Sequence, residues 1–151
     1  MNLKDFNIEQ FLDLEGYEQS RLDRRKGSGG SQEFFTPYSI VLRMCDKVSE
    51  EDWADPDKTF LEPCAGNFQF VIFILYRRIH EYNIPWRKAL ENCYLVELML
   101  DNIQEGRARV HELLRNISPD YDPKVADEIM DKNFVCHDFF TWDFEEWKPY
   151  K

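Results

Sequence analysis

Short apolar runs alternate along this chain with longer segments whose apolar residues recur every three or four positions. The apolar runs predict three strands, over 59–61, 92–96 and 134–136. The periodic segments predict helices, over about 38–50, 68–82 and 99–114, with shorter ones over 86–91 and 124–130 and a helix or two over about 3–25. Strands that alternate with helices are typical of an α/β fold, with a parallel sheet and right-handed crossovers.

Two of these helices carry a clear burial pattern. The first half of 68–82 is apolar on nearly every side, so we expect it to be buried against the sheet. On helix 99–114 the inward-facing residues are expected to be Leu100, Ile103, Val110 and Leu114. A Gly/Ser stretch, 27–31, separates the first helical segment from the remainder. The expected organisation is a helical segment with a flexible linker over 1–30 and one α/β domain over 31–151.

The stretch 59–70, TFLEPCAGNFQF, has the order strand, tight turn, helix. Ligands of open α/β sheets bind at the carboxyl ends of the strands, where helix N-terminal amides and nearby acids converge. Gly66 would let the backbone approach a ligand closely, because it has no Cβ. An ordinary turn between a strand and a helix explains this stretch equally well when it is taken alone.

Four segments in order resemble motifs of class I S-adenosylmethionine-dependent methyltransferases, specifically the N6-adenine DNA methyltransferases. The turn EPCAGNFQF resembles motif I, which reads roughly (D/E)-P-(A/C)-(C/A)-G-(T/N/D)-G-x-F. Upstream, QEFFTP over 32–37 resembles motif X; downstream, YLVEL over 94–98 with Asp101 and Asn102 resembles motif II. Finally, NFVCHDFF over 133–140 resembles motif III, usually (I/V)-x-x-G-D-(A/F)-(L/F).

The resemblance implies a Rossmann-like methyltransferase fold, here a partial parallel sheet flanked by helices, with S-adenosylmethionine as cofactor. Glu97 would accept hydrogen bonds from the ribose hydroxyls, and Asp138 would accept one from the adenine amino group. The full set of implied cofactor-binding residues is Phe35, Thr36, Pro37, Glu62, Pro63, Cys64, Ala65, Gly66, Asn67, Glu97, Leu98, Asp138 and Phe139. For each acid, the alternative is a helix N-cap or a solvated surface carboxylate.

The chain departs from the family pattern at Phe68, where motif I usually has a second glycine. A phenylalanine there could stack on the ligand, turn inward to the core, or obstruct the pocket. The sequence leaves these three alternatives open.

Motif IV, (D/N/S)-P-P-(Y/F/W), which holds the flipped adenine, is missing from this sequence. NIPW over 83–86 and SPDY over 118–121 match it only in part, and we interpret both as turns. No nucleophile, metal site or proton-transfer pair stands out as a separate catalytic centre. The sequence therefore predicts the S-adenosylmethionine-binding half of a DNA adenine-N6 methyltransferase-like protein. It would be inactive without a second methyltransferase subunit that supplies motif IV. The alternative is a non-catalytic, methyltransferase-derived acidic interaction protein or cofactor sensor.

The net charge limits the expected binding partners, and the cysteines indicate the cellular compartment. The net charge of −10 opposes duplex binding, so DNA is expected to bind only weakly or through a partner. The basic segment with Arg21, Arg24, Arg25 and Lys26 is either a nucleic-acid arm or, more commonly, a solvated helix end. Cys45, Cys64, Cys93 and Cys136 lie far apart, and we expect buried or half-buried free thiols in a reducing cytoplasm. No apolar run reaches the ~20 residues of a membrane span, and the N-terminus has no secretory pattern.

Overall fold

A three-stranded parallel sheet in the order β1-β2-β3 forms the centre of the computed structural model, which describes residues 5–14 and 35–151. The strands are β1 (Phe60–Glu62), β2 (Cys93–Glu97) and β3 (Phe134–Cys136). Leu61 is opposite Tyr94, and Val96 is opposite Val135. The predicted parallel α/β arrangement is confirmed for this sheet, and each predicted strand lies within one residue of its observed position.

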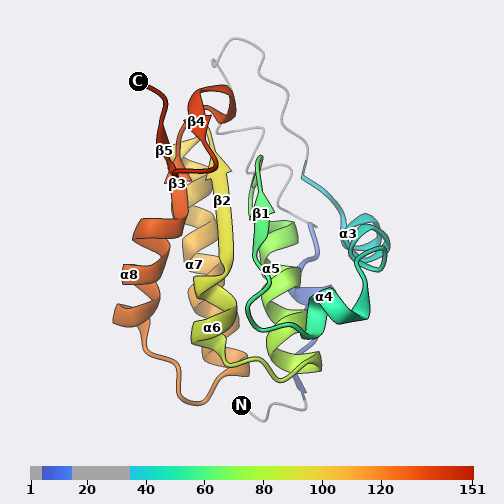
Figure 1. Ribbon diagram of the computed structural model, residues 1–151. Coiled ribbons are helices and arrows are strands. Elements are labelled where there is room, and N and C mark those ends of the chain that lie inside the picture. Colours follow the sequence, from blue (N-terminus) through green and yellow to red (C-terminus); the bar gives the residue numbers. More distant parts are fainter. Residues whose placement is uncertain (1–4, 15–34) are drawn as a thin grey trace.

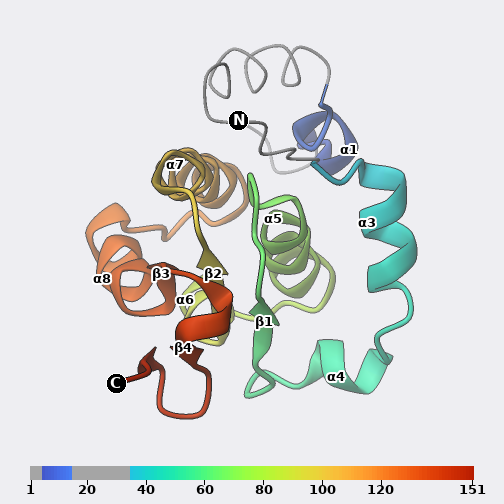
Figure 2. The same ribbon diagram turned by 90° about the horizontal axis from the view of Figure 1, so that it is seen from above.

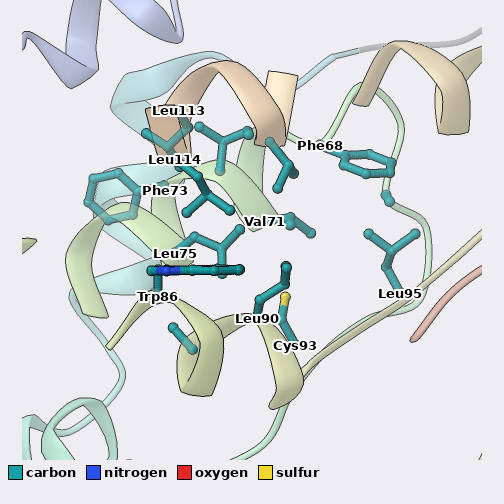
Figure 3. Close-up of a cluster of buried hydrophobic side chains, with 14 of the residues drawn as sticks. Phe68, Val71, Phe73, Leu75, Trp86, Leu90, Cys93, Leu95, Leu113 and Leu114 are labelled. Atoms are coloured by element: carbon teal, nitrogen blue, oxygen red, sulfur yellow. The ribbon is translucent and has the colours of Figure 1, made fainter. Parts of the chain in front are cut away.

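One face of the sheet is covered by α5 (Gln69–Tyr76) and α7 (Leu100–Ile117), which lie side by side in Figures 1 and 2. The predicted helix over 68–82 continues beyond α5 as a π-helix, η2 (Arg77–Glu81). As predicted, the first half of this helix is buried, and Val71, Ile72 and Phe73 have no exposed surface. These side chains join residues of β2 and α7 in the core cluster of Figure 3.

The inward stripe of α7 was predicted correctly at Ile103, Val110 and Leu114, which are all buried. Leu100 was predicted wrongly, because its side chain is 58% exposed. It is the first residue of α7, so it lies at the end of the helix, before the part that packs between α5 and α8 (Pro123–Asn133). Between η2 and β2, the short helix α6 (Trp86–Glu91) has the predicted bounds.

The N-terminal half contributes α1 (Ile8–Phe11), α3 (Tyr38–Cys45) and α4 (Glu50–Ala54). The helix predicted over 38–50 ends at Cys45. A separate helix, α4, begins at Glu50, where Ser49 accepts a hydrogen bond from the Asp52 amide at 3.1 Å. α3 packs against α5, with the Tyr38 and Phe73 rings 6.0 Å apart. The Gly/Ser linker, the basic segment and most of the helical segment predicted over 3–25 lie outside the described residues.

The last residues form a small unit that the sequence analysis did not predict. A 3-10 helix, η3 (Phe139–Thr141), leads into an antiparallel hairpin of β4 (Trp142–Asp143) and β5 (Lys148–Pro149). The Trp147 ring meets Tyr94 of β2 edge to face at 5.0 Å. Successive side chains of a strand point to opposite faces, and Leu95 belongs to the core, so Tyr94 points to the other face. The hairpin therefore lies on the face opposite α5 and α7, as Figure 2 shows.

Candidate functional site

The turn between β1 and α5 is fixed by three backbone amides, one of which donates to the end of β1 and two to the end of β2. The Cys64 amide donates to Glu62 Oε1 at 3.1 Å, and the Ala65 amide donates to the Val96 carbonyl at 3.2 Å. The Gly66 amide donates to Glu97 Oε2 at 2.5 Å. Gly66 has a φ of +53°, a left-handed conformation that glycine adopts without steric cost. The carboxyl ends of β1 and β2 therefore meet at this turn, with one acid from each strand.

Glu97 connects the two turns that follow these strands. Besides the hydrogen bond that Oε2 accepts from the Gly66 amide, Oε1 of Glu97 accepts one from the Met99 amide at 3.0 Å. Glu97 is only 7% exposed. Each carboxylate oxygen can accept more than one hydrogen bond, and charge-assisted bonds of this kind are strong. Glu97 thus organises the turns at the strand ends, whatever else it binds.

The segment 35–37 lies against the same turn. The Phe35 ring is so close to Gly66 that a Cβ there would lie 3.4 Å from Phe35 Cδ1. The Thr36 carbonyl accepts from Gln69 Nε2 at 3.0 Å, which ties the segment to the first turn of α5. Pro37 is exposed and forms the N-cap of α3.

The third strand brings its end to the site through the backbone. The His137 amide donates to the Glu97 carbonyl at 3.1 Å. The Asp138 carboxylate accepts from the Phe140 amide at 3.0 Å and caps η3, which is the alternative role that the sequence left open for each acid. Nearby apolar side chains are exposed: Leu98 is 65% exposed and Phe139 is 37% exposed.

Phe68 turns inward to the core, which settles the choice among its three possible orientations. It is completely buried (Figure 3). Its ring meets Phe134 edge to face at 5.5 Å. The ring also lies on Gly106 of α7, where an added Cβ would come within 2.3 Å of it. Phe68 has a φ of +75°, so the backbone here has the conformation that favours glycine although the residue is phenylalanine. The ring neither obstructs the turn nor stacks on a ligand there.

A buried polar network behind the turn was missed by the sequence analysis. Arg109 of α7 donates to the Asn67 carbonyl at 2.6 Å, to Gln69 Oε1 at 2.8 Å and to the Phe11 carbonyl at 3.3 Å. Gln69 in turn donates to the Leu12 carbonyl at 2.9 Å. The network joins α1, the turn and α7. Its signal in the sequence was the position of Arg109, three residues after buried Gly106 and four before buried Leu113.

Asn67 adds an unusual feature to the turn. Its side chain is buried, and within the described residues Nδ2 has no hydrogen-bond partner. A buried amide without a partner costs about 1–3 kcal/mol. Such a group at a strand end is a candidate contact for a ligand with an acceptor atom.

The electrostatics of the turn centre on Glu62. Burial raises the pKa of this carboxyl; the Cys64 amide opposes the rise and the charge of Glu97 adds to it. A carboxyl whose pKa is raised by folding stabilises the protein fully below its unfolded pKa, about 4.3 for glutamate. That stabilisation is lost as pH rises through the folded pKa.

We therefore expect Glu62→Gln, which imitates the protonated form at every pH, to raise the unfolding temperature at pH 7.5. At pH 4 the variant and the wild type should differ much less. Thermal unfolding followed by circular dichroism at both pH values measures this, with exposed Glu145→Gln as the control. An equal shift at the two pH values would contradict the assignment.

The cysteines are free thiols, but two of them are more exposed than predicted. Cys45 and Cys93 are buried, and burial raises their pKa values to about 11 and about 12. Cys64 and Cys136 are exposed, because both come at the carboxyl ends of strands, where the covering helices have not yet begun. Among the described residues, no group of three or more His, Cys, Asp or Glu side chains is arranged to hold a metal ion.

The two partial matches to motif IV are turns, as predicted. Asn83, with a φ of +56°, lies in the connection between η2 and α6, and 118–121 connects α7 to α8. Figure 1 shows both connections at the amino ends of the strands, opposite the turn between β1 and α5. Neither can serve the site described above.

No helix in the part of the chain that the structure describes is both long enough and apolar enough to cross a bilayer.

Comparisons with known proteins identify no relative. No family model, no curated protein and no solved structure matches this chain.

Proposed function

We propose that this chain is the S-adenosylmethionine-binding half of a DNA adenine-N6 methyltransferase-like protein. The hydrogen bond from the Gly66 amide to the Glu97 carboxylate carries the proposal. It joins the segments that resemble motifs I and II at the carboxyl ends of two adjacent parallel strands. Nucleotide-type ligands of α/β sheets bind at such strand ends.

The neighbouring groups suit the parts of this cofactor. The carboxylate of Glu97 is the acceptor for the ribose hydroxyls, and exposed Leu98 and Phe139 supply apolar surface for the adenine ring. Asp138 is the acceptor for the adenine amino group. The Phe35 ring against Gly66 supports a position for 35–37 at the methionine end.

Catalysis in this proposal requires a partner. A second methyltransferase subunit would supply motif IV, whose first side chain and aromatic ring hold the flipped adenine. It would also supply most of the DNA contact, since the net charge of −10 opposes binding of this chain to phosphates. A cytoplasmic restriction–modification context belongs to the same proposal.

A second candidate is a non-catalytic acidic interaction protein or cofactor sensor derived from a methyltransferase. One observation favours it. Asp138, the proposed adenine acceptor, caps η3. Binding of S-adenosylmethionine without any partner-dependent methyl transfer would support the sensor.

Calorimetric titration with S-adenosylmethionine tests the proposal. We expect Glu97→Gln to weaken binding by about 1.5–3 kcal/mol, the range for a hydrogen bond to a charged group. Because Glu97 also holds two turns, the unfolding free energy of the ligand-free variant must be measured beside it.

Leu98→Ala separates binding from folding. Its side chain is 65% exposed, so its loss should change stability by less than about 0.5 kcal/mol. We expect weaker binding all the same, because the adenine ring loses apolar surface. The matched control is Met44→Ala on α3, an exposed apolar residue away from the strand ends, which should leave binding unchanged. A wild-type chain that binds no S-adenosylmethionine would overturn the proposal.

A further inference from the structure

The outer edge of β1 has no neighbouring strand among residues 5–14 and 35–151. β1 pairs with β2 alone, and the Phe60 amide donates across that pair to the Asn92 carbonyl at 2.9 Å. Successive amides of a strand point to opposite sides, so the amide and carbonyl of Leu61 point to the open edge. An edge of this kind is a template for pairing with another extended segment.

An open cavity lies beside this edge, on the sheet face that carries the hairpin. Its volume is about 330 Å³, and Leu61, Tyr94, Phe144 and Trp147 are among its lining residues, together with Glu145. Leu61 is 48% exposed although it lies in the sheet. We call Leu61, Tyr94, Phe144, Glu145 and Trp147, with the open edge of β1, the β1 edge surface. It offers unpaired backbone groups and room for an apolar side chain in one place.

The surroundings of the β1 edge surface are acidic. Residues 57–64 and 138–151 carry six carboxylates and three lysines. Two of those lysines form ion pairs, Lys58 with Asp52 and Lys148 with Glu146, and one of the carboxylates, Asp57, pairs with Lys88. Oppositely charged partners are attracted to such a surface, whereas a second copy of a chain with a net charge of −10 is repelled.

We propose that the β1 edge surface binds an extended segment of a partner protein in which apolar and basic residues alternate. The segment adds a strand to β1 through the backbone groups of Leu61. Its apolar side chains fill the cavity against Tyr94 and Trp147. Its basic side chains point to the opposite face of the sheet, where Trp53 of the acidic helix α4 stacks on Phe60. Strand addition of this kind draws its affinity from main-chain hydrogen bonds and its specificity from side-chain pockets. The inference needs no cofactor, so it stands or falls separately from the function proposed above.

A synthetic peptide of eight residues, alternating valine and lysine and blocked at both ends, is the probe. Binding to the whole chain is measured by titration calorimetry and by tryptophan fluorescence, since Trp147 lines the cavity. We expect saturable one-to-one binding. A peptide of the same composition with all valines before all lysines should bind at least tenfold more weakly.

Leu61→Pro tests the strand pairing itself. Proline removes the outward amide and is tolerated on an open edge, so the variant should fold and bind the alternating peptide at least tenfold more weakly. If that variant fails to fold, Leu61→Lys keeps the amide, places a cation at the cavity and should weaken binding similarly. The control Met44→Lys, on α3, should leave peptide affinity within twofold. Equal binding of the two peptides would overturn the proposal. So would unaltered affinity in the folded Leu61 variants, or a wild-type dimer whose interface is disrupted by Leu61→Lys.

Discussion

Gly106→Ala is expected to destabilise the protein by about 3 kcal/mol, the upper end of the range for an overpacked core. The new Cβ would come within 2.3 Å of two atoms of the Phe68 ring. The ring has no room to move, because Phe68 is completely buried and packs on Phe134. The sign of the change in stability distinguishes overpacking from helix propensity, since propensity alone would make Gly→Ala in a helix favourable by about 1 kcal/mol. Chemical denaturation gives the change in unfolding free energy.

A double-mutant cycle isolates this contact. Phe68→Gly alone should lower the unfolding free energy by about 3–5 kcal/mol, because the buried ring is lost. Glycine adopts the left-handed conformation without strain, which should offset about 1–2 kcal/mol of this loss. Phe68→Gly with Gly106→Ala should cost clearly less than the sum of the two single changes, because the ring that clashes is absent. Ala108→Gly, at an exposed position of the same helix, supplies the propensity control. Strict additivity would show that the ring does not lie against Gly106.

Arg109→Met is expected to cost about 2–4 kcal/mol and to release α1 from the domain. The change leaves the carbonyls of Asn67 and Phe11 and the side-chain oxygen of Gln69 without this donor, and buried unsatisfied acceptors are costly. Hydrogen exchange should accelerate at the Phe11 and Leu12 amides, which bond within the helical turn of α1.

Arg107→Met is the matched control on the same helix. Arg107 pairs with Asp127 and Asp131 at the surface, where such pairs contribute about 0–1 kcal/mol. It should therefore leave stability and exchange in α1 nearly unchanged. Equal effects of the two substitutions would show that the polar network does not hold α1.

The strands and most helices followed from apolar patterning because burial decides them. β3 has the predicted bounds, and β1 and β2 are shifted by one residue. The hairpin of β4 and β5 was missed because its order depends on contacts distant in sequence, such as Trp147 on Tyr94. Element patterns carry no information on such contacts.

The candidate site could be predicted only in part. The convergence of Gly66 and Glu97 follows from parallel strands whose carboxyl ends share one edge. The orientation of Phe68 could not be predicted in this way, because it depends on the space that Gly106 leaves in α7, a helix that comes much later in the sequence. Arg109 was overlooked because arginine is usually exposed, although its position on α7 coincides with the buried stripe.

The order β1-β2-β3 also bears on how the chain assembles as it is made. Strands that are consecutive in the sequence are adjacent in the sheet. The connection from β1 to β2 contains α5, η2 and α6, and the connection from β2 to β3 contains α7 and α8. Each pairing therefore needs closure of a single loop, and no strand has to be inserted between two that are already paired. On a ribosome, β1, α5 and β2 can come together before β3 has been synthesised, so the turn at Gly66 and its bond to Glu97 can form early.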